Sequence, residues 1–550
     1  MRHLSGIDSA FLYLETPEMP MHVGSLNIYN LPPGYQGDFY EDVKRHVASR
    51  MHLAAVFQRK LALMPFELAN PVWVDDDDID LDYHVRRIVL SKPGTMAQLE
   101  AYVGRLHSSL LDRSRPLWEF YVIEGLATGQ VAFYTKAHHA GMDGAAGVAL
   151  ANAIMDTGPV PRTVRPPPAR TASRHYQLGV AELAGAALSN VAVQLVKLAK
   201  LAPSIARAAA SIALPPRGPD GKRRPRLPTG IAIGPRTVLN VAITNQRVFA
   251  GQSLPLADAK LIAKQLNVTL NDVVLALCAG ALRRYLEDRG GVPKKSLIAG
   301  VPVSLREPGN TDMNNQVTMM LASLATDIAD PVARLRAIHA SAASSKEFTG
   351  NIKAAIPLDF PSLGAPWLIT GLASLYGRSR VANILPPIAN VAISNVPGPQ
   401  FPLYLAGAKM VSYFPVSIPG HGIALNMTVE SYNGSLDFGL TACRRAVPDV
   451  REIADHLRGA LDELKGLVLA APAEHVADAV VMPKRTVKRP AAKGVARHPA
   501  VVARAARQAG PAAAAGNGVA KVAGNGAAKP TGAKLRVGAR RRRVLQPKAA

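Results

Sequence analysis

Apolar and polar side chains alternate with a period of two along residues 131–138, a stretch rich in β-branched and aromatic residues. This pattern predicts a strand, because successive side chains of a strand point to opposite faces. The alternation puts His138 on one face and His139 on the other, so the two histidines are expected to have different roles. Residues 145–155 predict a helix, and Asp143 just before it interacts favourably with the helix dipole.

The segment between the predicted strand and the predicted helix is the strongest candidate for chemistry. It reads His138-His139-Ala-Gly-Met-Asp143-Gly144. An imidazole exposed where a strand turns into a helix titrates near neutral pH and can remove a proton from a hydroxyl or a thiol. A core or surface role is the commoner one for a single strand histidine and stays open. No metal site is predicted, because the histidines face apart and no Cys or Glu lies nearby to complete a ligand set.

Three further short motifs accompany this segment: Pro116-Leu117-Trp118, Asn271-Asp272 and Ser394-Asn395. On local chemistry alone, Trp118 lies in an alternating segment and is expected to be a core aromatic residue. Asn271 and Asp272 open an apolar stretch, where capping of a helix explains them as well as catalysis does. Ser394 and Asn395 stand after a predicted strand and before Pro-Gly-Pro, which predicts a turn that ends the strand.

These motifs, together with the N-terminal stretch at residues 4–11, resemble those of the bacterial wax ester synthase/diacylglycerol acyltransferase family. The resemblance covers about residues 1–468, with a less typical middle. The HHxxxDG motif itself is shared with a superfamily that includes chloramphenicol acetyltransferase and peptide-synthetase condensation domains. The resemblance implies an α/β (α+β) fold of two lobes, like that of chloramphenicol acetyltransferase, enclosing a channel that meets at His139.

The resemblance also implies roles for individual residues. His139 would be the general base, Asp143 would orient the turn, and His138 and Gly144 would complete the motif. Asn271 or a backbone N–H is a candidate oxyanion donor. The expected substrate region takes in the remaining motif residues, Pro116, Leu117, Trp118, Asp272, Ser394 and Asn395.

The implied activity is transfer of a long-chain acyl group from acyl-CoA to the hydroxyl of diacylglycerol, which forms triacylglycerol. Long-chain alcohols, giving wax esters, are an alternative acceptor class. No bound cofactor is expected, since acyl-CoA is a co-substrate. Two other hypotheses stay open: a catalytically weak protein of lipid bodies or membranes on the same scaffold, and an acyltransferase that uses a carrier-protein thioester.

The chain divides into four predicted parts by composition. Residues 1–160 form the lobe that carries HHxxxDG, and residues 236–470 form a second α/β lobe that ends in a helix. Between them, residues 161–235 are a helical linker flanked by Pro/Arg-rich stretches. Residues 471–550 are rich in Ala, Gly, Pro, Lys and Arg and have no aromatic residue, a composition typical of disorder.

The net charge of +24 belongs mostly to the tail. From residue 481 onward there are 17 Lys or Arg and no Asp or Glu, and subtracting these leaves +7 for residues 1–480. Such a tail binds anionic lipid or nucleic acid, or has no specific partner, and the sequence does not choose among these.

Cys278 and Cys443 lie in apolar runs and predict buried free thiols. With neither an apolar leader nor a run of about 18 apolar residues, the expected location is the cytoplasm, with peripheral attachment to the inner membrane or to lipid bodies left open.

Overall fold

The computed structural model describes residues 2–4, 6–62, 71–76, 78–142, 144–166, 234–304, 317–353, 383 and 386–470. Asp143, most of the predicted linker and the basic tail lie outside these described residues.

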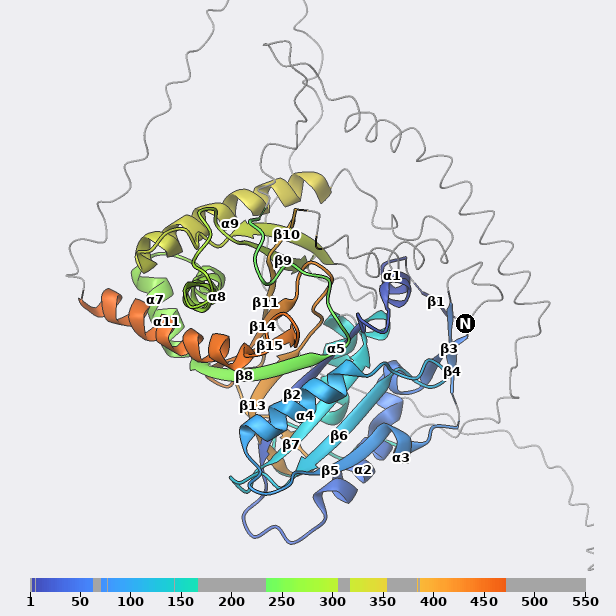
Figure 1. The fold of residues 1–550 in the computed structure, drawn as a ribbon. Coiled ribbons are helices and arrows are strands. Elements are labelled where there is room, and N and C mark those ends of the chain that lie inside the picture. The colour runs from blue at the N-terminus through green and yellow to red at the C-terminus, as the bar shows by residue number, and fades with distance from the viewer. Residues whose placement is uncertain are drawn as a thin grey trace, which may run out of the picture. The chain divides into compact units, whose positions relative to one another are not determined.

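The first sheet has six strands in the order β12-β13-β2-β7-β6-β5 (Figure 1). Their bounds are β2 (His22–Asn30), β5 (Val85–Val89), β6 (Trp118–Glu124), β7 (Val131–His138), β12 (Tyr404–Leu405) and β13 (Ala408–Val416). Only β5 and β6 pair in parallel, and the other neighbours are antiparallel. The predicted strand at 131–138 is confirmed as β7, whose residues are all buried because both faces of the sheet are covered.

Helices cover this sheet on both faces. On one face α2 (Phe39–Arg50) and α5 (Gly144–Ile154) pack with Phe133 and Trp118 in one apolar cluster. On the other face α4 (Met96–Ser108) packs with Tyr134. Phe133 and Tyr134 are neighbours in β7, so the strand divides its apolar side chains between two cores, as the alternation predicts. The predicted helix at 145–155 is confirmed as α5.

The first 140 residues contain further short elements, and some of them form a small layer that adjoins the first sheet. Three strands make a sheet in the order β1-β4-β3. The elements are β1 (Arg2–His3), α1 (Gly6–Leu14), the 3-10 turns η1 (Met51–Leu53) and η2 (Ala55–Phe57), β3 (Arg59–Ala62), β4 (Val72–Asp75) and α3 (Leu81–His84). Leu12 of α1 and Leu61 of β3 share an apolar cluster with Leu117 and Ala140, so this layer packs beside the His138-His139 segment.

The second sheet also has six strands, in the order β10-β9-β11-β14-β15-β8. These are β8 (Arg247–Pro255), β9 (Ile298–Ser304), β10 (Val317–Ser323), β11 (Val391–Pro397), β14 (Leu425–Tyr432) and β15 (Ser435–Cys443). The helices α7 (Leu256–Gln265), α8 (Leu270–Glu287), α9 (Pro331–Lys353) and α11 (Val450–Ala470) gather on one side of it (Figure 1). With the sheet they enclose the largest apolar cluster among the residues that the structure describes.

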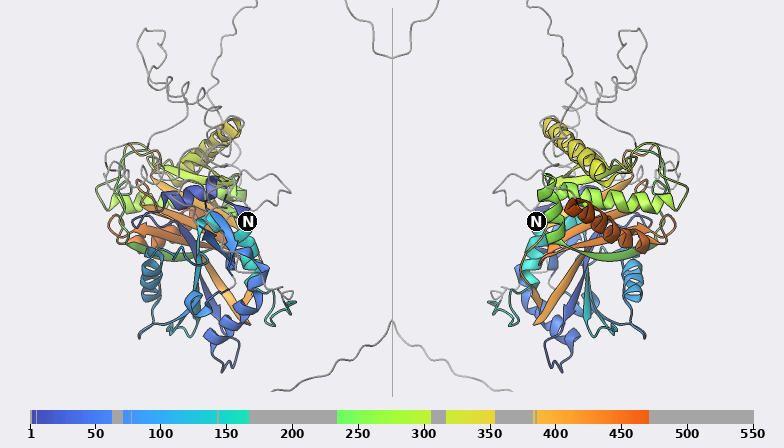
Figure 2. Two further views of the ribbon diagram at one scale, coloured as in Figure 1. Left: turned by 90° about the vertical axis from the view of Figure 1, so that its right-hand side faces the viewer. Right: turned by 90° about the vertical axis from the view of Figure 1, so that its left-hand side faces the viewer.

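Strand β13 ties the two sheets together. It comes late in the chain, yet it pairs with β2 of the first sheet, beside which it lies in Figure 2. It also packs against β15, where the backbone N–H of Tyr413 donates to Asp437 Oδ2 at 2.7 Å. A side chain at Gly439 would lie 1.7 Å from the backbone oxygen of Pro415, so only glycine permits this close approach. The expected two-lobe α/β fold is confirmed, whereas the exact lobe boundaries stay predictions.

Two smaller expectations have different outcomes. Cys278 and Cys443 are buried and free, as predicted. The turn predicted at Ser394 and Asn395 is wrong: both lie inside β11, because parallel pairing with β14 carries the strand through Pro397. Among the described residues, no single helix is long and apolar enough to cross a membrane, and α7 with α8 meets that test only as a pair bent by 107°.

Candidate functional site

The site is built at the end of β7. The strand ends at His138, and His139 begins the 3-10 turn η4 (His139–Gly141). The backbone N–H of His139 donates to Met21 O at 2.9 Å. Its ring stacks on Phe11 of α1, with the ring centres 4.0 Å apart and the planes inclined by 10°. Backbone and ring are thus both positioned, and the residue is half-buried.

His138 is buried and has a different environment. Its Nδ1 accepts the backbone N–H of Ala140 at 3.1 Å, which caps the 3-10 turn. Because a backbone N–H only donates, the proton of the neutral ring must lie on Nε2, which donates to Glu15 Oε2 at 3.1 Å. Both ring nitrogens are therefore engaged in holding the turn.

Glu15, just after α1, is the anchor of this arrangement. Besides His138, its carboxylate accepts the backbone N–H of Met21 at 2.9 Å and the guanidinium of Arg113 at 2.8 Å. Burial raises the pKa of Glu15, but the hydrogen bonds from His138 and Met21 and the positive charge of Arg113 outweigh it and lower the pKa to about 2. The carboxylate is thus firmly ionised at neutral pH. Neither Glu15 nor Arg113 is among the residues predicted from the sequence, although both stand close to predicted motifs.

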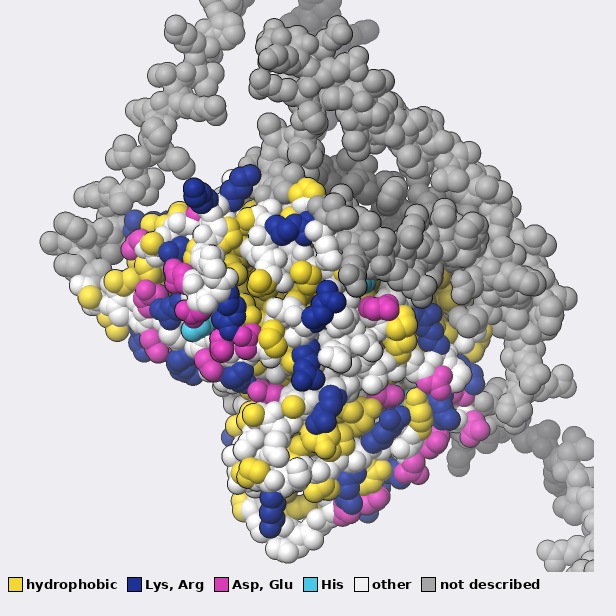
Figure 3. Space-filling view, viewed as in Figure 1, with side chains coloured by type: hydrophobic (Ala, Val, Ile, Leu, Met, Phe, Trp, Pro, Cys, Tyr) yellow, Lys and Arg dark blue, Asp and Glu magenta, His cyan; other side chains and the backbone are white. Residues whose placement is uncertain are grey.

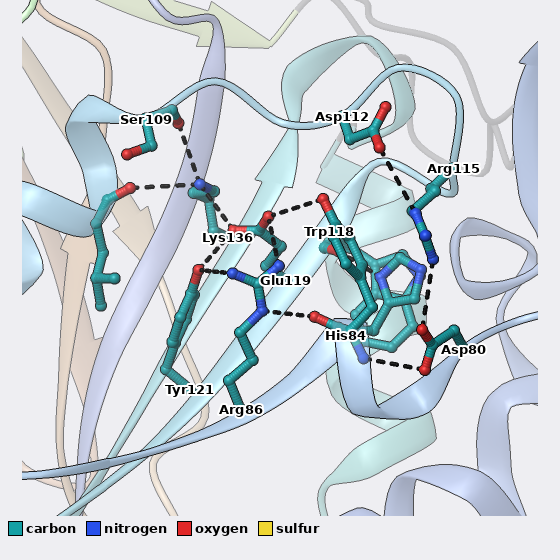
Figure 4. A network of polar contacts seen from close by, with 12 residues as sticks. Asp80, His84, Arg86, Ser109, Asp112, Arg115, Trp118, Glu119, Tyr121 and Lys136 are labelled. Carbon is teal, nitrogen blue, oxygen red and sulfur yellow. Dashed lines mark hydrogen bonds and ion pairs between the residues drawn. The ribbon is translucent and has the colours of Figure 1, made fainter.

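A buried ion pair supports the same region on the face of β7 to which His138 belongs (Figure 4). Lys136 is fully buried, and its ammonium donates to Glu119 at 2.9 Å and to the backbone oxygens of Leu106 at 3.3 Å and Ser109 at 3.1 Å. The hydroxyl of Tyr121 donates to the same carboxylate at 2.7 Å. Burial lowers the pKa of Lys136, and Glu119 opposes part of that shift. The pair joins β6, β7 and the end of α4, two residues before His138 in β7.

The Pro116-Leu117-Trp118 motif lies directly beside the histidines, because β6 pairs with β7. The backbone N–H of His138 donates to Leu117 O at 3.0 Å. Trp118 is fully buried, donates through Nε1 to Phe57 O at 3.2 Å and stacks on His84 (Figure 4). The prediction that Trp118 is a core aromatic residue is confirmed.

A cavity of about 120 Å³ adjoins the motif, between α5 and the first sheet. It lies on the face of β7 that the alternation assigned to His139. Its lining residues are Val23, Gly24, Ser25, Asn27, Thr135, Ala137, Met142, Gly147, Leu150, Ala151, Ile154, Met155 and Tyr413. Most of these side chains are apolar, so the cavity suits a hydrocarbon group.

The motif residues of the second lobe meet at the start of α8. Thr269 caps this helix in a reciprocal capping box with Asp272, so the predicted helix start is confirmed. Asp272 is buried and also binds His339 Nδ1 at 2.7 Å. Asn395 Nδ2 donates to Asn271 Oδ1 in a long contact of 3.4 Å, which brings these two motifs together. Ser394 points to the other face of β11, in register with Thr428.

The predicted site residues thus fall into two groups. One, at the end of β7, holds His138, His139 and Leu117; the other, at the start of α8, holds Asn271 and Asn395. Gly144 is the first residue of α5, and Asp143 lies outside the described residues.

Comparison with known proteins identifies the chain's family. A model of the wax ester synthase/diacylglycerol acyltransferase catalytic domain matches residues 4–274, and a model of the C-terminal domain of the same family matches residues 313–465. The chain is 39% identical over 469 residues to a Mycobacterium tuberculosis protein provisionally named a diacylglycerol O-acyltransferase, covering 84% of this chain and 100% of that protein. It is 34% identical over 475 residues to the O-acyltransferase WSD of Acinetobacter baylyi, covering 85% and 98% of the two chains.

A solved structure agrees with these matches. The wax ester synthase/diacylglycerol acyltransferase from Marinobacter aquaeolei VT8 superposes with a TM-score of 0.60 at 33% identity, over 85% of this chain and 99% of that one. Both family models, full-length relatives and a solved fold therefore converge, and the chain belongs to the wax ester synthase/diacylglycerol acyltransferase family.

Proposed function

We propose that this acyl-CoA-dependent O-acyltransferase uses His139 as the general base that activates the hydroxyl of its acceptor. The observation that carries the proposal is the difference between the two histidines. His138 is buried with both ring nitrogens engaged, whereas His139 is half-buried on a turn held by its backbone and by the Phe11 ring. Only His139 combines a fixed position with access to a substrate.

In the proposed reaction, His139 removes the proton of the hydroxyl while its oxygen attacks the thioester carbonyl of acyl-CoA. The carbon–oxygen bond forms, the tetrahedral oxyanion collapses, and the carbon–sulfur bond breaks. Protonated His139 then donates its proton to the departing CoA thiolate. A positioned base of this kind contributes roughly 10²–10⁴-fold to the rate. Asp143 is proposed to orient the turn, and the reaction requires no bound cofactor.

Asn271 is the proposed donor to the oxyanion. The Oδ1 of Asn271 accepts a hydrogen bond from Asn395. The Nδ2 group of Asn271 is therefore the part of its amide that is proposed to donate to the oxyanion. Asn271 stands in the first turn of α8, an 18-residue helix whose N-terminal dipole also favours negative charge. Loss of one oxyanion donor costs roughly 10²–10³-fold in kcat.

The proposed acceptor is diacylglycerol, with long-chain alcohols as the second candidate class. Purified full-length protein given labelled palmitoyl-CoA with diacylglycerol or hexadecanol separates the two by product. His139→Ala is expected to abolish synthesis of either ester, while His456→Ala on α11 leaves it unchanged. Undiminished synthesis by His139→Ala would refute the assigned base. If synthesis strictly requires an acyl group on a pantetheinylated carrier protein, the acyl donor is that carrier thioester and not acyl-CoA.

A peripheral role at anionic lipid surfaces is a second proposal, supported by the 17 basic and no acidic residues after position 480. Over the face drawn in Figure 3, by contrast, Lys and Arg are interspersed with Asp and Glu. Deletion after Ala470 is expected to weaken adsorption to anionic vesicles without changing turnover of dispersed substrate. Equal adsorption of the full-length and shortened chains would refute the lipid-binding role of the tail. Binding of nucleic acid by the full-length chain but not by the shortened one would assign the tail to that partner instead.

A further inference from the structure

We infer that the cavity between α5 and the first sheet seats an aliphatic chain of a substrate whose reacting end lies at His139, and that Gly147 of α5 limits the chain it admits. The inference rests on the proposed function. It goes further by assigning a binding site for the part of the substrate that does not react.

The cavity extends from the reacting position into the protein. Ala137 and Thr135, which line it, stand two and four residues before His139 in β7. At about 3.4 Å per strand residue, the lining therefore reaches from about 7 to about 14 Å away from His139 along the strand. At the near end Met142, three residues after His139, also lines the cavity. A chain attached to a group at His139 is thus led along the sheet, beneath α5.

The wall formed by α5 suits a hydrocarbon. Leu150, Ala151 and Ile154 contribute apolar groups, and Met142 and Met155 contribute flexible thioethers that adapt to different occupants. The volume of about 120 Å³ is close to that of an engineered apolar cavity of about 150 Å³ that binds benzene. By that comparison, the cavity holds a chain segment of about six carbon atoms.

The opposite wall carries one unsatisfied acceptor. Ser25 Oγ and Thr135 Oγ1 lie 2.9 Å apart in a hydrogen bond, and Asn27 Nδ2 donates to Ser25 Oγ at 3.1 Å. Asn27 is 1% exposed, and its Oδ1 has no hydrogen-bond partner among the described residues. A buried acceptor of this kind calls for a donor from an occupant, either a water beside the chain or a hydroxyl on it. The unsatisfied Asn27 Oδ1 is a separate observation from the volume and lining of the cavity, and it also indicates that the cavity is occupied in the working protein.

Gly147 is the position at which a larger side chain can be introduced to reduce the space available to the substrate chain. A Cβ built there meets only Met142 Sδ, at 3.8 Å, which is ordinary contact, so a larger side chain can extend into the cavity. Gly24 lines the same cavity but offers no such test, because its Cβ would lie 1.9 Å from the backbone oxygen of Thr135. Val148, the next residue of α5, is 61% exposed and supplies a matched control on the solvent side.

The experiment compares Gly147→Leu with Val148→Leu and the unchanged protein in two series. One varies the donor from hexanoyl-CoA to stearoyl-CoA with a fixed alcohol, and the other varies the alcohol with a fixed acyl-CoA. Burial of one methylene changes binding about fourfold, so excluding three of them is expected to lower kcat/KM about 60-fold for long chains and little for the shortest. The series that responds identifies the substrate that uses the cavity, and Val148→Leu is expected to change neither.

A Gly147→Leu profile that is unchanged in both series, or that falls uniformly at every length, overturns the inference while leaving the acyltransferase proposal intact. Absence of ester synthesis by the unchanged protein would instead refute the proposed function. If Gly147→Leu does not fold, as judged by circular dichroism, the same series on Gly147→Ala decides. Its added methyl group makes only ordinary contact, and a smaller shift in the same direction is expected.

Discussion

Replacing Glu15 with Gln tests whether a buried carboxylate holds the catalytic turn. The substitution keeps the shape of the side chain but removes its charge and puts an NH2 group among donors. His138, the backbone of Met21 and Arg113 all donate to this carboxylate, so at least one of them must lose its acceptor. The side chain is 3% exposed, so water cannot replace the lost bonds.

The magnitude follows from the pKa of Glu15, which is lowered from 4.5 to about 2. A difference of one pKa unit corresponds to about 1.4 kcal/mol, so the folded state gains about 3 kcal/mol from ionised Glu15. Because the folded-state pKa is the lower one, this stabilisation is fully present above about pH 4.5 and is lost as the pH falls from 4.5 towards 2. Glu15→Gln is expected to lower the free energy of unfolding by about 3 kcal/mol at pH 7, and by much less near pH 2.5.

Urea unfolding followed by tryptophan fluorescence at several pH values measures this difference. Glu18→Gln is the matched control, because Glu18 lies three residues further on and is only half-buried. Coincident unfolding curves for Glu15→Gln and Glu18→Gln at pH 7 would refute the reasoning, as would a deficit that does not shrink at acid pH. A lower kcat for Glu15→Gln with little change in KM is also expected, since the turn that carries His139 would lose its anchor.

Three further substitutions test neighbouring parts of the structure. Lys136→Met leaves the Glu119 carboxylate buried without its ammonium partner and is expected to cost about 3–5 kcal/mol in urea unfolding; adding Glu119→Leu should restore much of that loss, and no restoration would contradict the pairing. Asp272→Asn weakens the capping box and the hydrogen bond to His339 at the start of α8 and is expected to cost about 1–2 kcal/mol; an unchanged thermal midpoint would contradict this. Phe11→Ala removes the ring stacked on His139 and is expected to lower kcat about tenfold or more, because small displacements of a catalytic group are costly; unchanged kcat would show that the stack does not position the base.

Sequence patterning predicted the elements whose signals are local. The strand at 131–138, the helix that follows it, the start of α8 and the helix that ends the second lobe all agree with the structure. Each carries its own periodicity or cap within one short stretch of chain, so no distant partner is needed to recognise it. Ser394 and Asn395 were misjudged because their turn chemistry was overridden by a parallel partner strand more than 30 residues away.

The sequence by itself determined the family motifs, the histidine pair on opposite faces of a strand and the concentration of positive charge after residue 480. Only the tertiary structure decided what holds that pair. The Glu15 anchor is 123 residues from His138, β13 reaches the first sheet from the second half of the chain, and the cavity exists only between α5 and that sheet. Local hydrophobic pattern specifies which face of an element is buried, but it carries no information on which distant element will cover it. That choice is made by packing and by the need of each buried polar group for a partner.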